Sequence, residues 1–136
     1  MNQHEQPGTR EDLARYRLET ARSDIKAAII LLEAGEFRSA NNRAYYALYH
    51  MISAIHALDG KAFKRHKDTL GNFNKDYIKT EIFPRSFGHR IAEAEDIRHA
   101  SDYDDFFIAT KSEAEEQIAT ATELLKLIEI YCETRM

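Results

Sequence analysis

Apolar residues recur every three or four positions along most of this chain, which is the spacing of amphipathic α-helices. Only Pro7 and Pro84 interrupt the pattern, and no segment alternates at every second residue with an enrichment in β-branched side chains. Thr9 with Asp12 can cap a first helix that runs to about residue 32, and Gly35 suits the left-handed position that ends it. The pattern therefore predicts an all-α protein.

Four more helical segments follow in the pattern. A long one covers residues 37–58, and a shorter one covers residues 67–79. Pro84 opens the next, which is expected to end in an acidic turn at residues 101–105. Thr110 with Glu113 forms a capping box for the last. Short connections favour antiparallel neighbours, so we expect an antiparallel up-and-down four-helix bundle with one short extra helix.

Length and composition predict a single domain over residues 1–136, with residues 1–9 as a flexible tail. The hydrophobic content of 43% is enough for one continuous core. The longest apolar run, residues 27–32, is far short of the roughly 20 residues that span a bilayer. No membrane contact is expected, and the polar start of the chain, without a secretory signal, predicts a cytoplasmic protein. Cys132 is the one cysteine and is interpreted as a structural thiol.

The net charge of −4 argues against general electrostatic attraction to nucleic acid. Two local clusters depart from this average. An acidic one holds Asp102, Asp104 and Asp105; a basic one holds Lys61, Lys64, Arg65, His66 and Lys67. Either can be a solvated loop, but the basic cluster is the candidate for binding RNA or nucleotide phosphates. The acidic cluster lacks the length, glycine and final glutamate of a calcium site, and the glycines are scattered, so neither metal nor cofactor is expected.

The segment 37–58 has two patterned faces. One apolar stripe consists of Ala44, Leu48, Met51, Ile52 and Ile55. A second stripe combines small with hydrogen-bonding residues: Arg43, Tyr46, Ala47, His50, Ala54 and Ala57. Solvent-facing stripes normally carry Lys, Glu and Gln, so this composition predicts that another helix or subunit packs closely on the second stripe.

Several ordered motifs resemble the small proteins of the HEPN superfamily. The run from residue 40 to residue 49 is similar to their N-R-A-Y-Y-A signature, and the sequence F-K-R-H at 63–66 resembles an F-x-K-H turn. Residues 77–84 resemble an aromatic-V-K-T segment before a proline, and residues 96–103 resemble L-R-x-x-A-D-Y. The similarity covers about residues 15 to 130.

This resemblance implies a helical bundle that forms a homodimer and, in active members, cuts RNA at the twofold cleft without a metal. Those members use an arginine followed, after four to six residues, by a histidine. Arg98 occupies the usual arginine position, but Asp102, Tyr103 and Asp104 stand where the histidine is expected. An aspartate there is expected to form an ion pair with Arg98.

Arg43 and His50 are a second candidate pair, because six residues separate them and both lie on one helix face. The alternative is structural. In that interpretation Arg43, Tyr46 and His50 form a buried hydrogen-bond network with Asp102, Tyr103 or a second subunit, and Asn42 belongs to the same network.

Three functions remain open from the sequence. The first is a ribonuclease of a toxin–antitoxin or defence-type two-gene system, with Arg43, His50 and Arg98 as candidate catalytic residues. The second is a non-catalytic partner of a minimal nucleotidyltransferase. The third is a stand-alone helical dimer that binds nucleotide or RNA through the basic cluster.

Overall fold

The computed structural model describes residues 8–136, and these fold into helices with no strand. The long helices are α1 (Arg10–Glu33), α2 (Phe37–Leu58), α4 (Ser86–Tyr103) and α5 (Lys111–Glu133). The short α3 (His66–Phe73) continues into a π-helical turn, η2 (Asn74–Ile78). The all-helical prediction is confirmed. Most of the expected tail, residues 1–7, lies outside the described residues.

The predicted helix ends at Thr9 and Gly35 are confirmed. Thr9 and Asp12 bond each other's backbone amides in a full capping box, and Gly35 has a φ of 79°. The last helix differs from the prediction. The Thr110 hydroxyl accepts from the Glu113 amide, but the Glu113 carboxylate accepts from Asn41 Nδ2 at 3.2 Å. Half of that capping box is therefore replaced by a contact to α2.

We expected an acidic turn at residues 101–105 to end helix α4. The turn is wrong for residues 101–103, because α4 continues through Tyr103. Arg38 of α2 explains part of the difference. Its guanidinium donates to the Ser101 carbonyl at 3.0 Å and to the Phe107 carbonyl at 2.8 Å. These bonds satisfy a carbonyl in the last turn of α4 and tie the following loop to α2.

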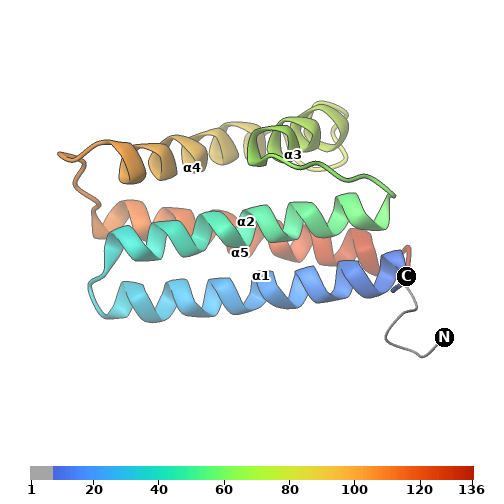
Figure 1. Ribbon diagram of the computed structural model, residues 1–136, viewed down its shortest axis with the longest axis horizontal. Coiled ribbons are helices and arrows are strands. Elements are labelled where there is room, and N and C mark those ends of the chain that lie inside the picture. The colour runs from blue at the N-terminus through green and yellow to red at the C-terminus, as the bar shows by residue number, and fades with distance from the viewer. Residues whose placement is uncertain (1–7) are drawn as a thin grey trace.

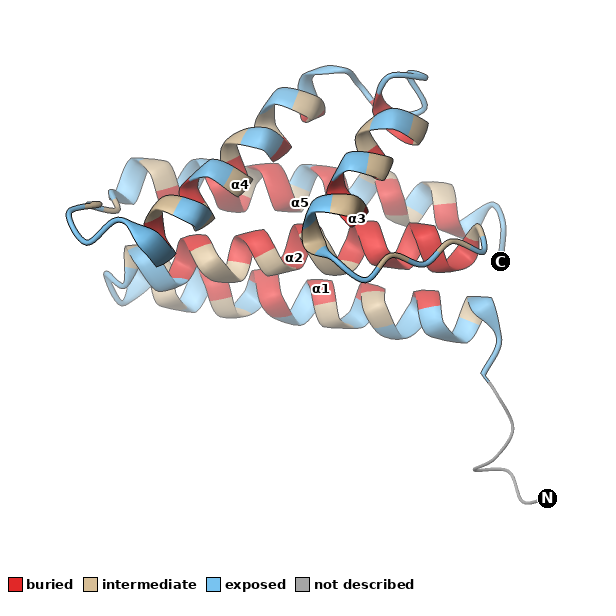
Figure 2. Ribbon diagram, turned by 45° about the horizontal axis from the view of Figure 1, so that its top comes forward, coloured by how far each residue is buried: buried red, intermediate tan, exposed pale blue. Residues whose placement is uncertain are grey.

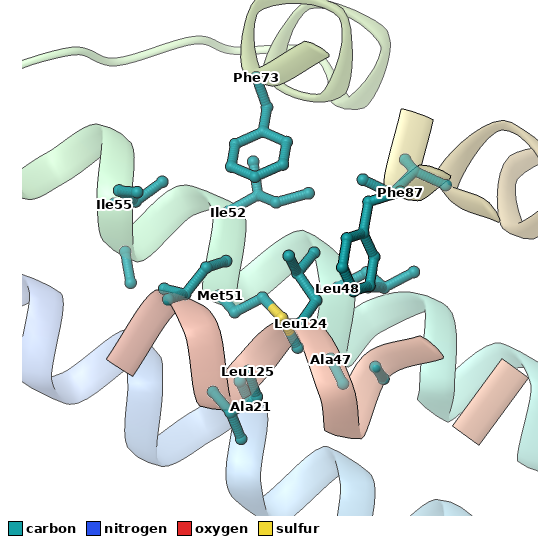
Figure 3. Close-up of a cluster of buried hydrophobic side chains, with 14 of the residues drawn as sticks. Ala21, Ala47, Leu48, Met51, Ile52, Ile55, Phe73, Phe87, Leu124 and Leu125 are labelled. Atoms are coloured by element: carbon teal, nitrogen blue, oxygen red, sulfur yellow. The ribbon is translucent and has the colours of Figure 1, made fainter. Parts of the chain in front are cut away.

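Helix α2 lies at the centre of the molecule and contacts α1, α3, α4 and α5. Figure 1 shows α1, α2 and α5 extended side by side, with α3 and α4 beyond α2. The red ribbon in Figure 2 marks how much of α2 is buried. Its apolar residues form the core with side chains from the other helices, among them Ala21, Phe73, Phe87, Leu124 and Leu125 (Figure 3). Among residues 8–136, no helix has the length and apolar content to cross a membrane.

The second stripe of α2 packs mainly within the chain. Ala47 and Ala54 are fully buried and belong to the same core cluster as Ala14 and Ala21 of α1. Small side chains let the two helix backbones approach closely. The sequence predicted that either another helix or another subunit packs on this stripe. In the structure, helix α1 of the same chain packs there.

A narrow part of α2 stays open to solvent. Between residues 40 and 58, only Asn42, Arg43, Tyr46, Tyr49 and His50 are half-buried, and every other residue is buried. Their spacing of three or four positions places them along one face of the helix. We call these five residues the open strip.

Candidate functional site

A buried carboxylate on α1 holds two residues of the open strip. Asp24 is 6% exposed; its Oδ1 accepts from Arg43 Nη1 at 3.0 Å, and its Oδ2 accepts from His50 Nδ1 at 2.7 Å. Burial of a charge is tolerated only with such partners. An ionised carboxylate has no proton to donate, so His50 carries its proton on Nδ1 and leaves Nε2 for other contacts.

The ring of Tyr46 is the centre of a wider group of polar side chains. The guanidinium carbons of Arg43 and Arg98 lie 5.2 Å and 5.8 Å from its centroid. The imidazoles of His66 and His50 lie 5.8 Å and 6.2 Å from it, centroid to centroid. These five residues come from α2, the start of α3 and the last part of α4. We call them the Tyr46 cluster.

His66 is held by two further tyrosines of α2. Its ring stacks on Tyr49 at a centroid distance of 4.0 Å, and its Nδ1 shares a hydrogen bond of 3.2 Å with the Tyr45 hydroxyl. Burial lowers the pKa of His66, and the charges of Arg98 and His50 lower it further. Burial also raises the pKa of Tyr45 to about 12. His66 is therefore neutral at physiological pH, beside a protonated phenol.

Arg98 lies over the same tyrosines and pairs with Asp102. Its Nη2 is 3.7 Å from Asp102 Oδ2, and its guanidinium carbon is 5.1 Å from the Tyr45 ring centroid. Burial by itself lowers the pKa of Arg98. The nearby Tyr46 hydroxyl and the surrounding charges, Asp102 included, outweigh burial and raise it. The expected Arg98–Asp102 pair is present, and the guanidinium stays charged.

The expected structural network forms only in part. Tyr46 contacts Arg43 and His50. Asp102 does not contact Tyr46 directly but pairs with Arg98, which lies over the Tyr46 ring. The direct acceptor for Arg43 and His50 is Asp24, and the site is half open where a buried network was expected. Tyr103 takes no part: its side chain is 74% exposed and lies against His99. It lies in the last turn of α4, where it projects into solvent.

Asn42 of the open strip is half-buried. Its Oδ1 has no hydrogen-bond partner within the described part of the chain.

The predicted basic cluster is divided by the fold. Lys61 Nζ lies 3.1 Å from an Asp76 carboxylate oxygen, and Arg65 Nε lies 3.1 Å from one of Asp68. His66 belongs to the Tyr46 cluster. The exposed Lys64 and Lys67 form no ion pair within residues 8–136.

Across the same described range, no group of three or more His, Cys, Asp or Glu side chains is arranged to hold a metal ion.

Asp24, Tyr45 and Tyr49 were not among the residues selected from the sequence. A signal for Asp24 exists, because it is a charged residue within the apolar stripe that includes Ala21, Ile25 and Ala28. A carboxylate at such a position needs a buried partner from another element. The tyrosines gave no comparable signal, since aromatic residues on a central helix are ordinary core residues.

Comparison with known proteins agrees with this helical architecture. The family model described as HEPN domain matches residues 14–131. A Thermotoga maritima protein of the UPF0332 group is 28% identical over 120 residues, which cover 88% of this chain and 91% of that protein. A Methanocaldococcus jannaschii protein named "Putative toxin MJ0142" is 29% identical over 98 residues, covering 72% and 67% of the two chains. A second protein of that organism, named "Putative toxin MJ0605", is 29% identical over 86 residues, covering 63% and 64%. The chain therefore belongs to the HEPN domain family.

Proposed function

We propose that this HEPN protein is a toxin-like endoribonuclease that cleaves RNA without a metal at the open strip of α2. One observation carries the proposal: two arginines and two histidines surround the ring of Tyr46, within 6.2 Å of its centroid. Cleavage of an RNA phosphodiester needs positive charge for the phosphate and two groups that move protons. The Tyr46 cluster contains both.

The two histidines suit different roles in the reaction. His66 is neutral; when its Nδ1 donates to the Tyr45 oxygen, Nε2 has a free lone pair and can remove the proton of the 2′-hydroxyl. The Nδ1–H of His50 donates a hydrogen bond to Asp24, so Nε2 is the nitrogen that would carry the proton for an acid role. That proton can pass to the departing 5′-oxygen.

The bonds and protons of this reaction balance. The 2′-oxygen forms a bond to phosphorus, the bond from phosphorus to the 5′-oxygen breaks, and the proton lost to His66 is matched by the proton given by His50. The products are a 2′,3′-cyclic phosphate and a 5′-hydroxyl. Arg98 and Arg43 supply charge for the phosphorane-like transition state.

Binding and assembly are further parts of the proposal. Lys64 and Lys67 flank His66 in sequence and are exposed, so they can contact phosphates next to the scissile bond.

We take the working form to be a homodimer, as the family resemblance implies. We also take α1, α2, α4 and α5 as the antiparallel up-and-down bundle and α3 as the extra helix. The word toxin in the names of the two Methanocaldococcus jannaschii relatives supports a toxin-like role. We take the protein to act within a toxin–antitoxin or defence-type two-gene system, as the family resemblance implies.

One observation favours a second candidate, a non-catalytic partner of a minimal nucleotidyltransferase. The last residue of α4 and the loop after it expose three large side chains, namely Tyr103 (74%), Phe106 (91%) and Ile108 (80%). Exposed apolar side chains in one segment are typical of protein contacts. The sequence of this region also departs from the usual arginine–histidine motif after Arg98.

The test is cleavage of labelled RNA in the presence of EDTA by the wild type and by single alanine variants of His50, His66, Arg98 and Arg43. Each substitution in the Tyr46 cluster is expected to reduce the rate by about 100-fold or more. His89→Ala is the matched control, because His89 is exposed on α4 and makes no hydrogen bond or ion pair within the described residues.

Products ending in 2′,3′-cyclic phosphate would agree with the proposed chemistry. A folded wild-type protein that leaves RNA intact would overturn it and favour the nucleotidyltransferase partner. Cleavage that persists in both histidine variants would also refute these roles.

A further inference from the structure

Two adjoining hollows lie next to His50, on the side of this residue that leads toward the end of α2. The outer hollow, about 310 Å³, is lined by residues of α1 and α2, namely Tyr16, Arg17, Thr20, Tyr49, His50 and Ser53. The inner hollow, about 60 Å³, shares Arg17, Tyr49 and Ser53 with it. The space therefore begins at the histidine to which the proposed reaction assigns the acid role.

The lining of these hollows carries positive charge. Its charged residues are Arg17 and Lys61, and no Asp or Glu of the described chain lines either hollow. Lys61 Nζ lies 3.1 Å from Asp76 Oδ2, so its charge is balanced. Arg17 forms no ion pair within residues 8–136. The unbalanced charge at the hollows is therefore that of Arg17, and it favours an anion.

A bond to α2 holds the guanidinium of Arg17 close to His50. Arg17 Nη1 donates to the Ser53 carbonyl oxygen at 3.0 Å. Ser53 follows His50 by three residues, which is a rise of about 4.5 Å along a helix. A guanidinium has several other N–H donors in a fixed plane, and these suit the oxygens of a phosphate. A phosphate donor is therefore fixed within one helical turn of His50.

Ser53 offers a second donor on the same wall. It is 8% exposed and lines both hollows, and its hydroxyl makes no hydrogen bond within the described part of the chain. A largely buried hydroxyl without a partner favours a ligand that bonds to it. The several acceptor oxygens of one phosphate can satisfy the hydroxyl and the guanidinium together.

We infer that Arg17 and Ser53 form a subsite for a second phosphate of the RNA, the one on the 3′-oxygen of the leaving nucleotide. This inference rests on the proposed function, because the outer hollow is lined by His50, which gives a proton to the leaving 5′-oxygen, and not by His66. It names the substrate class more closely: an RNA strand that continues by at least one phosphate beyond the leaving nucleoside.

The experiment measures binding without cleavage, so that its failure is distinct from a failure of the ribonuclease proposal. Two diadenosine nucleotides are used, each with a 2′-deoxy sugar in its first nucleotide, which removes the attacking hydroxyl. One carries an additional phosphate at its 3′ end and the other at its 5′ end, so their composition and charge are equal. Titration of the full chain, followed by NMR or calorimetry, is expected to give a Kd about tenfold lower for the 3′-phosphorylated ligand.

Three variants test the residues. Arg17→Gln removes the charge but keeps a donor for the Ser53 carbonyl, and it is expected to lose the preference. Ser53→Ala removes the hydroxyl and is expected to reduce the preference to about threefold. Arg15→Gln is the matched control, because the Arg15 side chain is 56% exposed on α1 and lines neither hollow. Both ligands are compared on the same folded protein, so a loss of stability does not imitate a loss of preference.

Equal Kd values for the two ligands in the wild type would overturn the inference, since attraction by charge alone does not distinguish them. Tighter binding of the 5′-phosphorylated ligand, or a preference that persists in Arg17→Gln, would overturn it as well. A preference for the 3′-phosphate in a protein that does not cut RNA would keep the subsite and reject the cleavage reaction. Cleavage of RNA without this preference would reject the subsite and keep the ribonuclease.

Discussion

Asp24 is the residue whose replacement tests the site most directly. In Asp24→Asn the side chain keeps its shape but loses its charge and one of its two acceptors. Arg43 Nη1 and His50 Nδ1, which now bond separate carboxylate oxygens at 3.0 Å and 2.7 Å, would compete for one amide oxygen. The other donor would face the amide NH₂ group, unless His50 changes its tautomer and moves its proton to Nε2.

The loss of stability follows from these contacts. Hydrogen bonds that involve a charged group contribute about 1.5–3 kcal/mol each. Water can replace part of this, because the Arg43 and His50 side chains are 40% and 29% exposed. We therefore expect the free energy of unfolding to fall by about 1–2 kcal/mol, which for a domain of this size lowers the melting temperature by about 3–6 °C.

The cleavage rate is expected to fall by much more than partial unfolding of the variant could explain. With its proton on Nε2 and Nδ1 bonded to the amide, His50 loses its hydrogen bond to the carboxylate, and its ring is held as the other tautomer. A reduction of the RNA cleavage rate by about 100-fold is expected, at a temperature where the variant remains folded. Thermal unfolding followed by circular dichroism, together with the cleavage assay, measures both effects.

Asp96→Asn is the matched control, because Asp96 is exposed on α4 and has no hydrogen bond or ion pair within the described residues. It should change neither quantity. Asp24→Asn with wild-type cleavage would refute the acid role of His50, and an unchanged melting temperature would refute the importance of the buried carboxylate.

Three further predictions concern the core and the buried titratable groups. Ala47→Lys should reduce helicity and lower the free energy of unfolding by about 3 kcal/mol or more, since Ala47 is fully buried within the chain; an unchanged melting curve would contradict the packing of α1 on α2. Burial raises the pKa of the Cys132 thiol to about 11, so its reaction with a thiol reagent near pH 8 should be slow in the folded protein and fast in urea; equal rates would contradict its burial. The pKa of His56 is lowered from its ordinary 6.5, chiefly by burial, so the unfolded chain takes up a proton there before the folded protein does. Stability should be fully present above about pH 6.5 and decrease as the pH falls below it, and urea titrations at several pH values should give a weaker pH dependence for His56→Gln.

The helices could be predicted from the sequence because their signals are local. The apolar period gave the five helical segments, and Thr9 and Gly35 marked the ends of the first through their own backbone preferences. Predictions that depended on another element were less accurate. The acidic turn was expected three residues too early, and Glu113 bonds Asn41 of α2 instead of completing a capping box.

The candidate site was predictable only in its α2 part. Arg43, Tyr46 and His50 could be selected because their spacing places them on one helix face. His66 was assigned to a basic loop, since nothing in its neighbours along the chain indicates that it lies on Tyr49. Arg98 was selected for its motif, but its contacts with Tyr45 and Tyr46 required the position of α4.

The sequence by itself determined that the chain is helical, where most of its helices begin and end, and which face of α2 carries Arg43, Tyr46 and His50. The tertiary structure decided which helix covers the alanines of that face and which acceptor holds Arg43 and His50. It also decided that His56 Nδ1 has no partner among the described residues. The reason is physical: helix formation depends on contacts three and four residues apart, whereas a site built from α1, α2, α3 and α4 depends on contacts between residues far apart in the chain.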